Sequence, residues 1–130
     1  MPNLTAFVTL LALSVYFGTS VQVARARASF GVKAPATIGH PEFERIFRTQ
    51  MNTLEWLPIF LPSIWLAALY VSDMAAAALG GVWIVGRILY IYGYRQAAEK
   101  RGIGFVVQSS AAAVLWMTAV VGVVQAILRA

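Results

Sequence analysis

The stretch PEFERIFRTQMNTLEWLPIFLPSIWLAALY, residues 41–70, decides the fold of this chain, because a cluster of charges at its start leads directly into an apolar run. Arg48, Asn52 and Glu55 are separated by four and three residues, which places the three side chains on one stripe of a helix. Glu55 lies in the part that is apolar enough to span a bilayer, where an isolated charge costs on the order of 2.5 to 3.5 kcal/mol. The sequence therefore predicts that this charge has a partner or binds a ligand.

The composition indicates a membrane protein. Of the 130 residues, 60% are hydrophobic and only 12% are charged, which is too apolar for a soluble domain of this size. The net charge of +5 could indicate nucleic-acid binding, but the basic residues flank apolar runs, so we interpret them as topology signals and as ligands for anions. The chain contains no cysteine, which excludes disulfides, thiolate metal sites and a thiol nucleophile of the protein itself.

Four apolar runs predict an all-α integral membrane protein, with residues 1–130 forming a single domain that is a bundle of four transmembrane helices. The first run has no ionisable side chain, and about 20 residues are enough to cross the hydrocarbon core. A cleaved signal peptide is the alternative, but the run lacks a preceding positive region and is too long. We expect the helices to span about 4–24, 41–71, 74–101 and 103–128.

The segment between the first two runs is rich in glycine, proline and basic residues, which predicts a loop over 25–40. Pro41, followed by acidic residues, is typical of a helix start. His40 is the only histidine and has no further ligand at metal-binding spacing, so we expect no metal site and assign it no role. Pro58 and Pro62 either bend the second helix just past the polar stripe or are simply tolerated in a transmembrane helix, and both interpretations stay open.

A second polar stripe is expected on the third helix, where Arg87, Tyr90, Tyr94 and Arg101 are offset by three, seven and fourteen residues. Small residues upstream predict close packing between helices: Ala76, Ala77, Gly80 and Gly81. Lysine and arginine gather in the first and third connections and are missing from the second, so the positive-inside tendency places the first and third connections in the cytoplasm. Both stripes then meet near the cytoplasmic face of the membrane.

The two stripes together hold several arginines, one carboxylate and two tyrosines. Guanidinium groups favour a ligand with more than one carboxylate, because their planar fork matches that group. Glu55 among them favours a cationic group such as an amine. A small, multiply anionic molecule with one amine fits this inventory, and glutathione is such a molecule. The alternative is that these residues only pair with one another as salt bridges within the bundle.

Two motifs resemble a known family. The run PEFERIFRTQMNTLEWLPIF resembles the signature of the membrane-associated proteins in eicosanoid and glutathione metabolism (MAPEG), and RILYIYGYRQAAEKR resembles the third helix of the same family. The likeness covers nearly the whole chain and implies a homotrimer that binds glutathione between neighbouring protomers near the cytoplasmic face. The glutathione-binding residues that it implies are Arg48, Asn52, Glu55, Trp56, Arg87, Tyr90, Tyr94 and Arg101, with Arg27 and Gln50 from the adjacent protomer.

What the resemblance implies is an enzyme, a glutathione S-transferase that conjugates glutathione to hydrophobic electrophiles, with reduction of lipid hydroperoxides as a further activity. Arg101 is the expected catalytic residue, because a nearby guanidinium populates the glutathione thiolate at neutral pH. Two departures from the family pattern are visible. Ala28 stands where the leukotriene-forming members have a second consecutive arginine, which argues against their substrate, and Trp56 replaces a tyrosine beside the site.

Other classes of function remain as alternatives. A non-catalytic lipid-binding scaffold of the same fold is the serious one. A small multidrug exporter would depend on a carboxylate in the first span, and that span has none. The expected partners are glutathione, a hydrophobic electrophile or lipid hydroperoxide, membrane lipid and two further copies of the chain, without metal or nucleic acid. The expected location is a bacterial inner membrane, with the site facing the cytoplasm.

Overall fold

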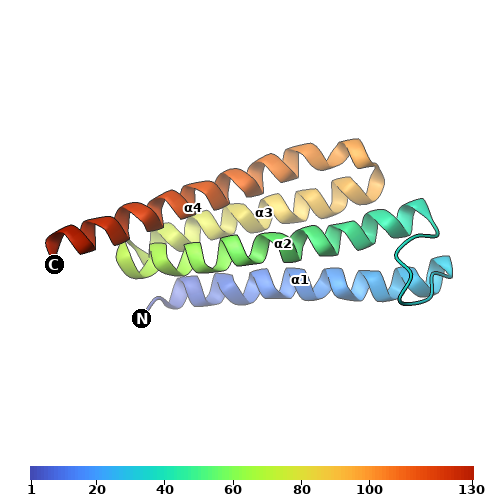
Figure 1. The fold of residues 1–130 in the computed structure, drawn as a ribbon, viewed down its shortest axis with the longest axis horizontal. Helices are drawn as coiled ribbons and strands as arrows, with labels where there is room; N and C mark the ends of the chain where they lie inside the picture. Colours follow the sequence, from blue (N-terminus) through green and yellow to red (C-terminus); the bar gives the residue numbers. More distant parts are fainter.

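The computed structural model describes all residues 1–130 as four long helices and one short 3-10 helix. The elements are α1 (Asn3–Phe30), α2 (Pro41–Tyr70), α3 (Asp73–Gln96), η1 (Ala98–Arg101) and α4 (Gly102–Arg129). Figure 1 shows the long helices side by side in an elongated bundle, with both termini at one end. The opposite end, which carries the α1–α2 connection and η1, is called the connection end below. The four long helices are long and apolar enough to cross a membrane, which confirms the predicted fold class.

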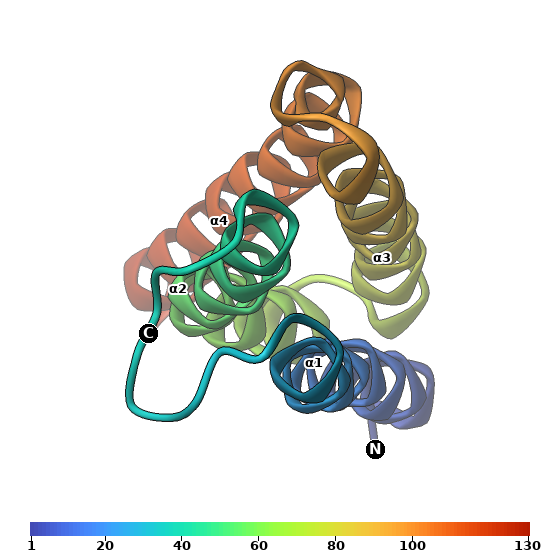
Figure 2. The same ribbon diagram turned by 90° about the vertical axis from the view of Figure 1, so that its right-hand side faces the viewer.

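The helices α2 and α3 form the middle of the bundle. Both α1 and α4 pack against this pair, and Figure 2 shows the arrangement from the connection end. Apolar side chains fill the space between the helices, and the ring of Phe60 on α2 stacks on Trp83 of α3 at 4.0 Å. Many large apolar side chains on the outside of all four long helices are exposed. Such a surface is suited to contact with lipid.

Small residues allow close helix contacts, as predicted for part of the third helix. Ala76 and Gly80 are buried, and a Cβ at Gly80 would collide with side chains of α1 and α2. Gly81 instead faces open space, so it has no packing role in the protomer. The backbones of α3 and α4 also approach closely, where Gly86 lies against the backbone of Gln108 and Gly104 lies against the backbone of Tyr90. A larger residue at Gly86 would force these two helices apart.

Two helix ends differ from the predictions. The first helix does not stop near residue 24 but continues to Phe30, so Arg25 and Arg27 are helical; the chain turns only at Gly31, which has a left-handed φ of 67°. The third helix does not continue to residue 101 but ends at Gln96, and Ala97 is extended before η1 begins. The returning chain passes so close to Gly93 that no Cβ would fit beside the Lys100 carbonyl. This close return replaces the predicted last helical turn.

His40, to which no role was assigned, caps a helix. Its Nδ1 accepts a hydrogen bond of 3.2 Å from the backbone N–H of Glu42, and its ring stacks on Phe30 at 4.2 Å. The side chain therefore satisfies one free donor at the start of α2, where Pro41 occupies the first turn. The cap also joins the end of α1 to the start of α2, and so fixes the direction in which the polar stripe of α2 leaves the connection end.

Candidate functional site

Arg48 and Glu55 form the only salt bridge of the structure. Nη1 and Nη2 of Arg48 donate to the two carboxylate oxygens of Glu55 at 2.9 and 3.2 Å. The pair spans two turns of α2, as the shared stripe predicts. About half of each side chain is exposed, with values of 49% and 53%, so the pair lies on the outer face of the protomer. The charge on Glu55 has the partner that its position required, and both groups remain accessible to a ligand.

Arg87 occupies a different environment, because its side chain is fully buried in the protomer. It donates hydrogen bonds to Oδ1 of Asn52 at 2.7 Å and to Oγ1 of Thr53 at 3.0 Å. Its guanidinium carbon also lies 4.4 Å from the ring centroid of Tyr90. Arg87 therefore contacts two predicted site residues, Asn52 and Tyr90, from the buried side of the site. The predicted stripe of α3 does not present it on the exposed face.

The two tyrosines of α3 continue from Arg87 toward the connection end. Tyr90 and Tyr94 are both buried, and their ring centroids are 5.5 Å apart. Arg101 is exposed and belongs to η1, yet its guanidinium carbon lies 5.3 Å from the Tyr94 ring centroid. The predicted neighbours are thus brought together by the return of the chain after Ala97. A continuous helix, which was the expected cause, does not exist there.

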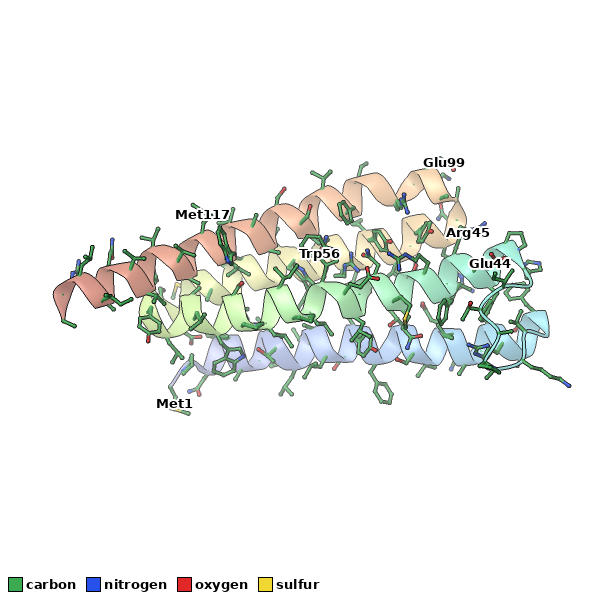
Figure 3. All side chains as sticks on the ribbon, in the orientation of Figure 1. Met1, Glu44, Arg45, Trp56, Glu99 and Met117 are labelled. Carbon is green, nitrogen blue, oxygen red and sulfur yellow. The ribbon has the colours of Figure 1, made fainter.

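Trp56 lies beside this aromatic group. Its ring contacts Phe105 of α4 edge-on, with centroids 5.8 Å apart, and Phe105 in turn lies 6.3 Å from Tyr90. Figure 3 shows Trp56 about midway along the bundle, well away from Arg45 and Glu44 at the connection end. Phe105 and Thr53 were not predicted as parts of the site. Thr53 could have been found, because it is four residues from Thr49 and next to Asn52 on the buried side of α2.

Two predicted residues, Arg27 and Gln50, lie elsewhere in the protomer. Arg27 donates to the carbonyl oxygens of Val32 and Ala36 at 3.3 and 2.7 Å, and so holds the α1–α2 connection. Gln50 points toward α1, where its Nε2 donates to Oγ of Ser20 at 3.0 Å. Neither side chain bonds to Arg48 or Glu55 within one chain.

An apolar groove of about 580 Å³ continues the face that carries Arg48 and Glu55. Residues 59, 62 and 66 extend the spacing of 48, 52 and 55, so the groove follows the same stripe of α2. It begins one turn beyond Glu55 and runs between α2 and α4. Its lining residues are Pro58, Ile59, Pro62, Ser63, Leu66, Trp116, Ala119, Val120, Val123 and Val124. A charged half and an apolar half therefore meet on one face of the protomer.

The sequence profile of the MAPEG family matches residues 5–121. An uncharacterized protein of Synechocystis is 50% identical over 118 residues, covering 91% of this chain and 86% of that protein. Microsomal glutathione S-transferase 2 of Homo sapiens is 39% identical over 125 residues, covering 96% of this chain and 85% of that protein. Leukotriene C4 synthase of Cavia porcellus is 43% identical over 98 residues, covering 75% of this chain and 65% of that protein.

These similarities cover nearly the full length of the bundle, and they agree with its four long, apolar helices. The chain belongs to the MAPEG family and is a multi-pass integral membrane protein.

Proposed function

We propose that this protein is a glutathione S-transferase that conjugates glutathione to hydrophobic electrophiles taken from the membrane. The observation that carries the proposal is the continuity of one face of α2, on which the accessible pair Arg48–Glu55 leads directly into the apolar groove. Such a face offers opposite charges to a zwitterionic, water-soluble molecule and an apolar surface to a second substrate. Similarity to proteins named as glutathione S-transferase and leukotriene C4 synthase supports the same assignment.

Glutathione has two carboxylates and one ammonium group, and Arg48 and Glu55 match one of the carboxylates and the ammonium group. On binding, the pair separates: the Arg48 guanidinium takes a carboxylate, and Glu55 takes the ammonium group. The exchange replaces one ion pair by two, so neither Arg48 nor Glu55 is left unpaired, and the second carboxylate of glutathione needs a further cation. Asn52, held in place by Arg87, supplies a neutral polar group between them. Tyr90, Tyr94 and Trp56 line the side of the bound tripeptide.

Arg101 is the proposed catalytic residue. A free thiol titrates near pH 8.5, so about 3% of it is ionised at pH 7, whereas a guanidinium next to the sulfur stabilises the thiolate. The exposed guanidinium carbon of Arg101 lies 5.3 Å from the ring centroid of Tyr94, which is the tyrosine nearer to the connection end. In the reaction the thiol proton is released to water, the thiolate sulfur forms a bond to the electrophilic carbon, and the leaving group departs with the electron pair of the broken bond.

The same thiolate accounts for a second proposed activity, the reduction of lipid hydroperoxides. One glutathione thiolate attacks the terminal peroxide oxygen, the O–O bond breaks, and the alkoxide takes up a proton and leaves as the alcohol. The glutathione sulfenic acid that forms then reacts with a second glutathione, which displaces water and gives glutathione disulfide. The apolar groove suits either a hydrophobic electrophile or a lipid hydroperoxide. The proposal therefore places both reactions in one site.

We propose further that the site is shared between the protomers of a homotrimer. The face with Arg48 and Glu55 is open in one chain, and Arg27 and Gln50 lie on other surfaces of that chain. A symmetric neighbour that covers the open face would bring its own Arg27 and Gln50 to the bound glutathione and could close a ring. The connection end, with its many basic residues, is assigned to the cytoplasmic side of a bacterial inner membrane.

The test is an assay of conjugate formation with detergent-purified protein. Glutathione and 1-chloro-2,4-dinitrobenzene are mixed with the protein, and the thioether product is followed by absorbance. We expect saturable formation of the conjugate above the uncatalysed rate, with chloride released in equal amount. Glutathione binding without turnover of this or of longer-chain electrophiles would contradict the enzyme and would favour the non-catalytic scaffold.

A further inference from the structure

We propose that the seam between α1 and α3 is a binding site for an anionic phospholipid, with the headgroup phosphate held by Arg25 and Arg95. This site is separate from the proposed glutathione site, which lies on the α2–α4 face. In Figure 2 the seam between α1 and α3 lies on a different side of the bundle from α2 and α4, the helices that line the apolar groove. The proposal does not depend on the transferase activity.

The headgroup part is a polar pocket of about 210 Å³ at the connection end. Its lining residues are Gln22, Arg25, Ala26, Ser29, Phe30, Ile46 and Arg95. The arginines come from different helices and converge on one space, although no carboxylate lines it. Both are exposed, and neither takes part in the single salt bridge of the structure. Two unpaired guanidinium groups facing one pocket are suited to a phosphate, which they can bind through paired N–H donors.

A third arginine adds positive charge at the same end of α3. Nη2 of Arg45 donates to the carbonyl oxygen of Arg95 at 3.4 Å, so its positive charge lies near Arg95, although Arg45 does not itself line the pocket. Its Nε is buried and has no hydrogen-bond partner. The added positive charge supports an anionic occupant over a neutral one.

The apolar part identifies the occupant as a lipid. A second pocket of about 170 Å³ continues along the α1–α3 seam, and Gln22 lines both pockets. Its lining residues are Val15, Gly18, Thr19, Gln22, Ile88, Ile91 and Tyr92. Gly18 leaves a notch there, because a Cβ on it would meet nothing within 4 Å.

Val15 and Arg25 are ten positions apart, which corresponds to about 15 Å of helix, and this length runs from the hydrocarbon region to the headgroup level. A phosphate site at the end of an apolar seam therefore fits a phospholipid and not a free phosphate.

The experiment measures lipid retained by the protein in detergent, using native mass spectrometry. Phosphatidylglycerol is the anionic probe, phosphatidylcholine is the zwitterionic control, and glycerol 3-phosphate tests whether a soluble phosphate can compete. We expect the protein to retain phosphatidylglycerol in preference to phosphatidylcholine, and glycerol 3-phosphate not to displace it. Each arginine near a membrane surface contributes about fivefold to the binding of an anionic lipid, so Arg25→Gln with Arg95→Gln should weaken retention about 25-fold.

Matched variants separate the site from general charge and from folding. Lys33→Gln removes an exposed positive charge from the neighbouring loop and should leave retention unchanged. The double variant Arg25→Lys with Arg95→Lys keeps the charges and should retain most of the binding. Gly18→Leu places a side chain in the notch, where a Cβ meets nothing within 4 Å, and should reduce retention of the lipid while both arginines remain. Helical circular dichroism of each variant shows that the bundle is intact.

Three results would overturn the proposal. Equal retention of both lipids would show that Arg25 and Arg95 do not select the headgroup. Displacement by glycerol 3-phosphate would assign the pocket to a soluble phosphate. The third result has two parts: the unmodified protein retains no lipid, and the Arg25→Gln, Arg95→Gln variant loses its oligomeric state. Together they would show that the seam between α1 and α3 contacts a neighbouring protomer and not a lipid.

Discussion

Nη2 of Arg87 donates a hydrogen bond of 2.7 Å to Oδ1 of Asn52, and it does so from a side chain with no exposed surface. The bond joins the middle of α3 to the middle of α2. It also holds Asn52 between Arg48 and Glu55, which lie on the outer face. Arg87 is therefore a positioning residue, and its contribution to glutathione binding is expected to pass through Asn52.

The first prediction tests this relationship with Arg87→Lys and Asn52→Ala. Lysine keeps the charge but cannot bond Asn52 and Thr53 together, so Arg87→Lys should destabilise the bundle by about 1 to 3 kcal/mol and raise the Kd of glutathione. Because the two residues act as one unit, the double variant should weaken glutathione binding little more than Asn52→Ala alone. Calorimetric titration measures the three Kd values. Additive losses would show that Arg87 acts independently of Asn52.

A second prediction concerns Glu55→Gln. The variant removes the group that is expected to hold the glutathione ammonium and leaves Arg48 without its partner. We expect the Kd of glutathione to rise at least tenfold and the oligomer to dissociate at a lower detergent concentration, because the unpaired Arg48 would be covered by the neighbour. Glu99→Gln, which changes an exposed carboxylate outside the site, is the control. A variant that bound glutathione as tightly as the parent would exclude the assigned role.

The third prediction assigns the thiolate to Arg101. Arg101→Ala should lower kcat by about one to two orders of magnitude while the Kd of glutathione stays within a few fold. The pH dependence should change as well: without the guanidinium the thiol returns to its ordinary pKa, so the rate of the variant should climb about tenfold per unit up to about pH 8.5. The parent should reach its plateau at lower pH. Lys100→Ala is the adjacent control, and equal losses in kcat and affinity for Arg101→Ala would make Arg101 a binding residue only.

A fourth prediction addresses stability. The carboxylate of Asp73 accepts hydrogen bonds from the backbone N–H groups of Leu4 and Thr5 at 3.1 and 2.8 Å, and no side chain of α1 caps that helix start. Asp73→Ala should therefore lower the melting temperature of the bundle by several degrees without changing the KM for glutathione. Thermal scans followed by circular dichroism measure the shift. Ser72→Ala removes the side-chain cap of α3 and serves as the comparison. Its shift in melting temperature shows how much stability the loss of an ordinary helix cap costs.

The four helices and the Arg48–Glu55 pair could be predicted from the sequence, whereas the burial of Arg87 could not. The four helices were predictable because apolar runs of sufficient length have only one stable form in a bilayer. The pairing of Arg48 with Glu55 followed from their spacing on one helix, which needs no knowledge of the neighbouring helices. The burial of Arg87 could not be predicted, because it depends on which face of α3 turns toward Thr53.

The predictions failed where the chain reverses direction. Ala97 has a high helix propensity, yet it is extended, because the close return against Gly93 decides the conformation. In the same way Arg25 and Arg27 were assigned to a loop on the basis of the glycines and prolines that follow them. The glutathione ligands, the trimer and the cytoplasmic orientation remain predictions.

Co-assembly of two defective chains tests the central claim most directly, namely that glutathione is conjugated in a site built by two protomers. One chain carries Arg27→Ala and Gln50→Ala, the other carries Arg48→Ala and Glu55→Ala, and different affinity tags allow mixed oligomers to be isolated. In each mixed ring one interface unites the two unmutated halves, so we expect conjugate formation to return although each chain alone is inactive. Mixed rings that contain both chains and still form no conjugate would contradict the shared site.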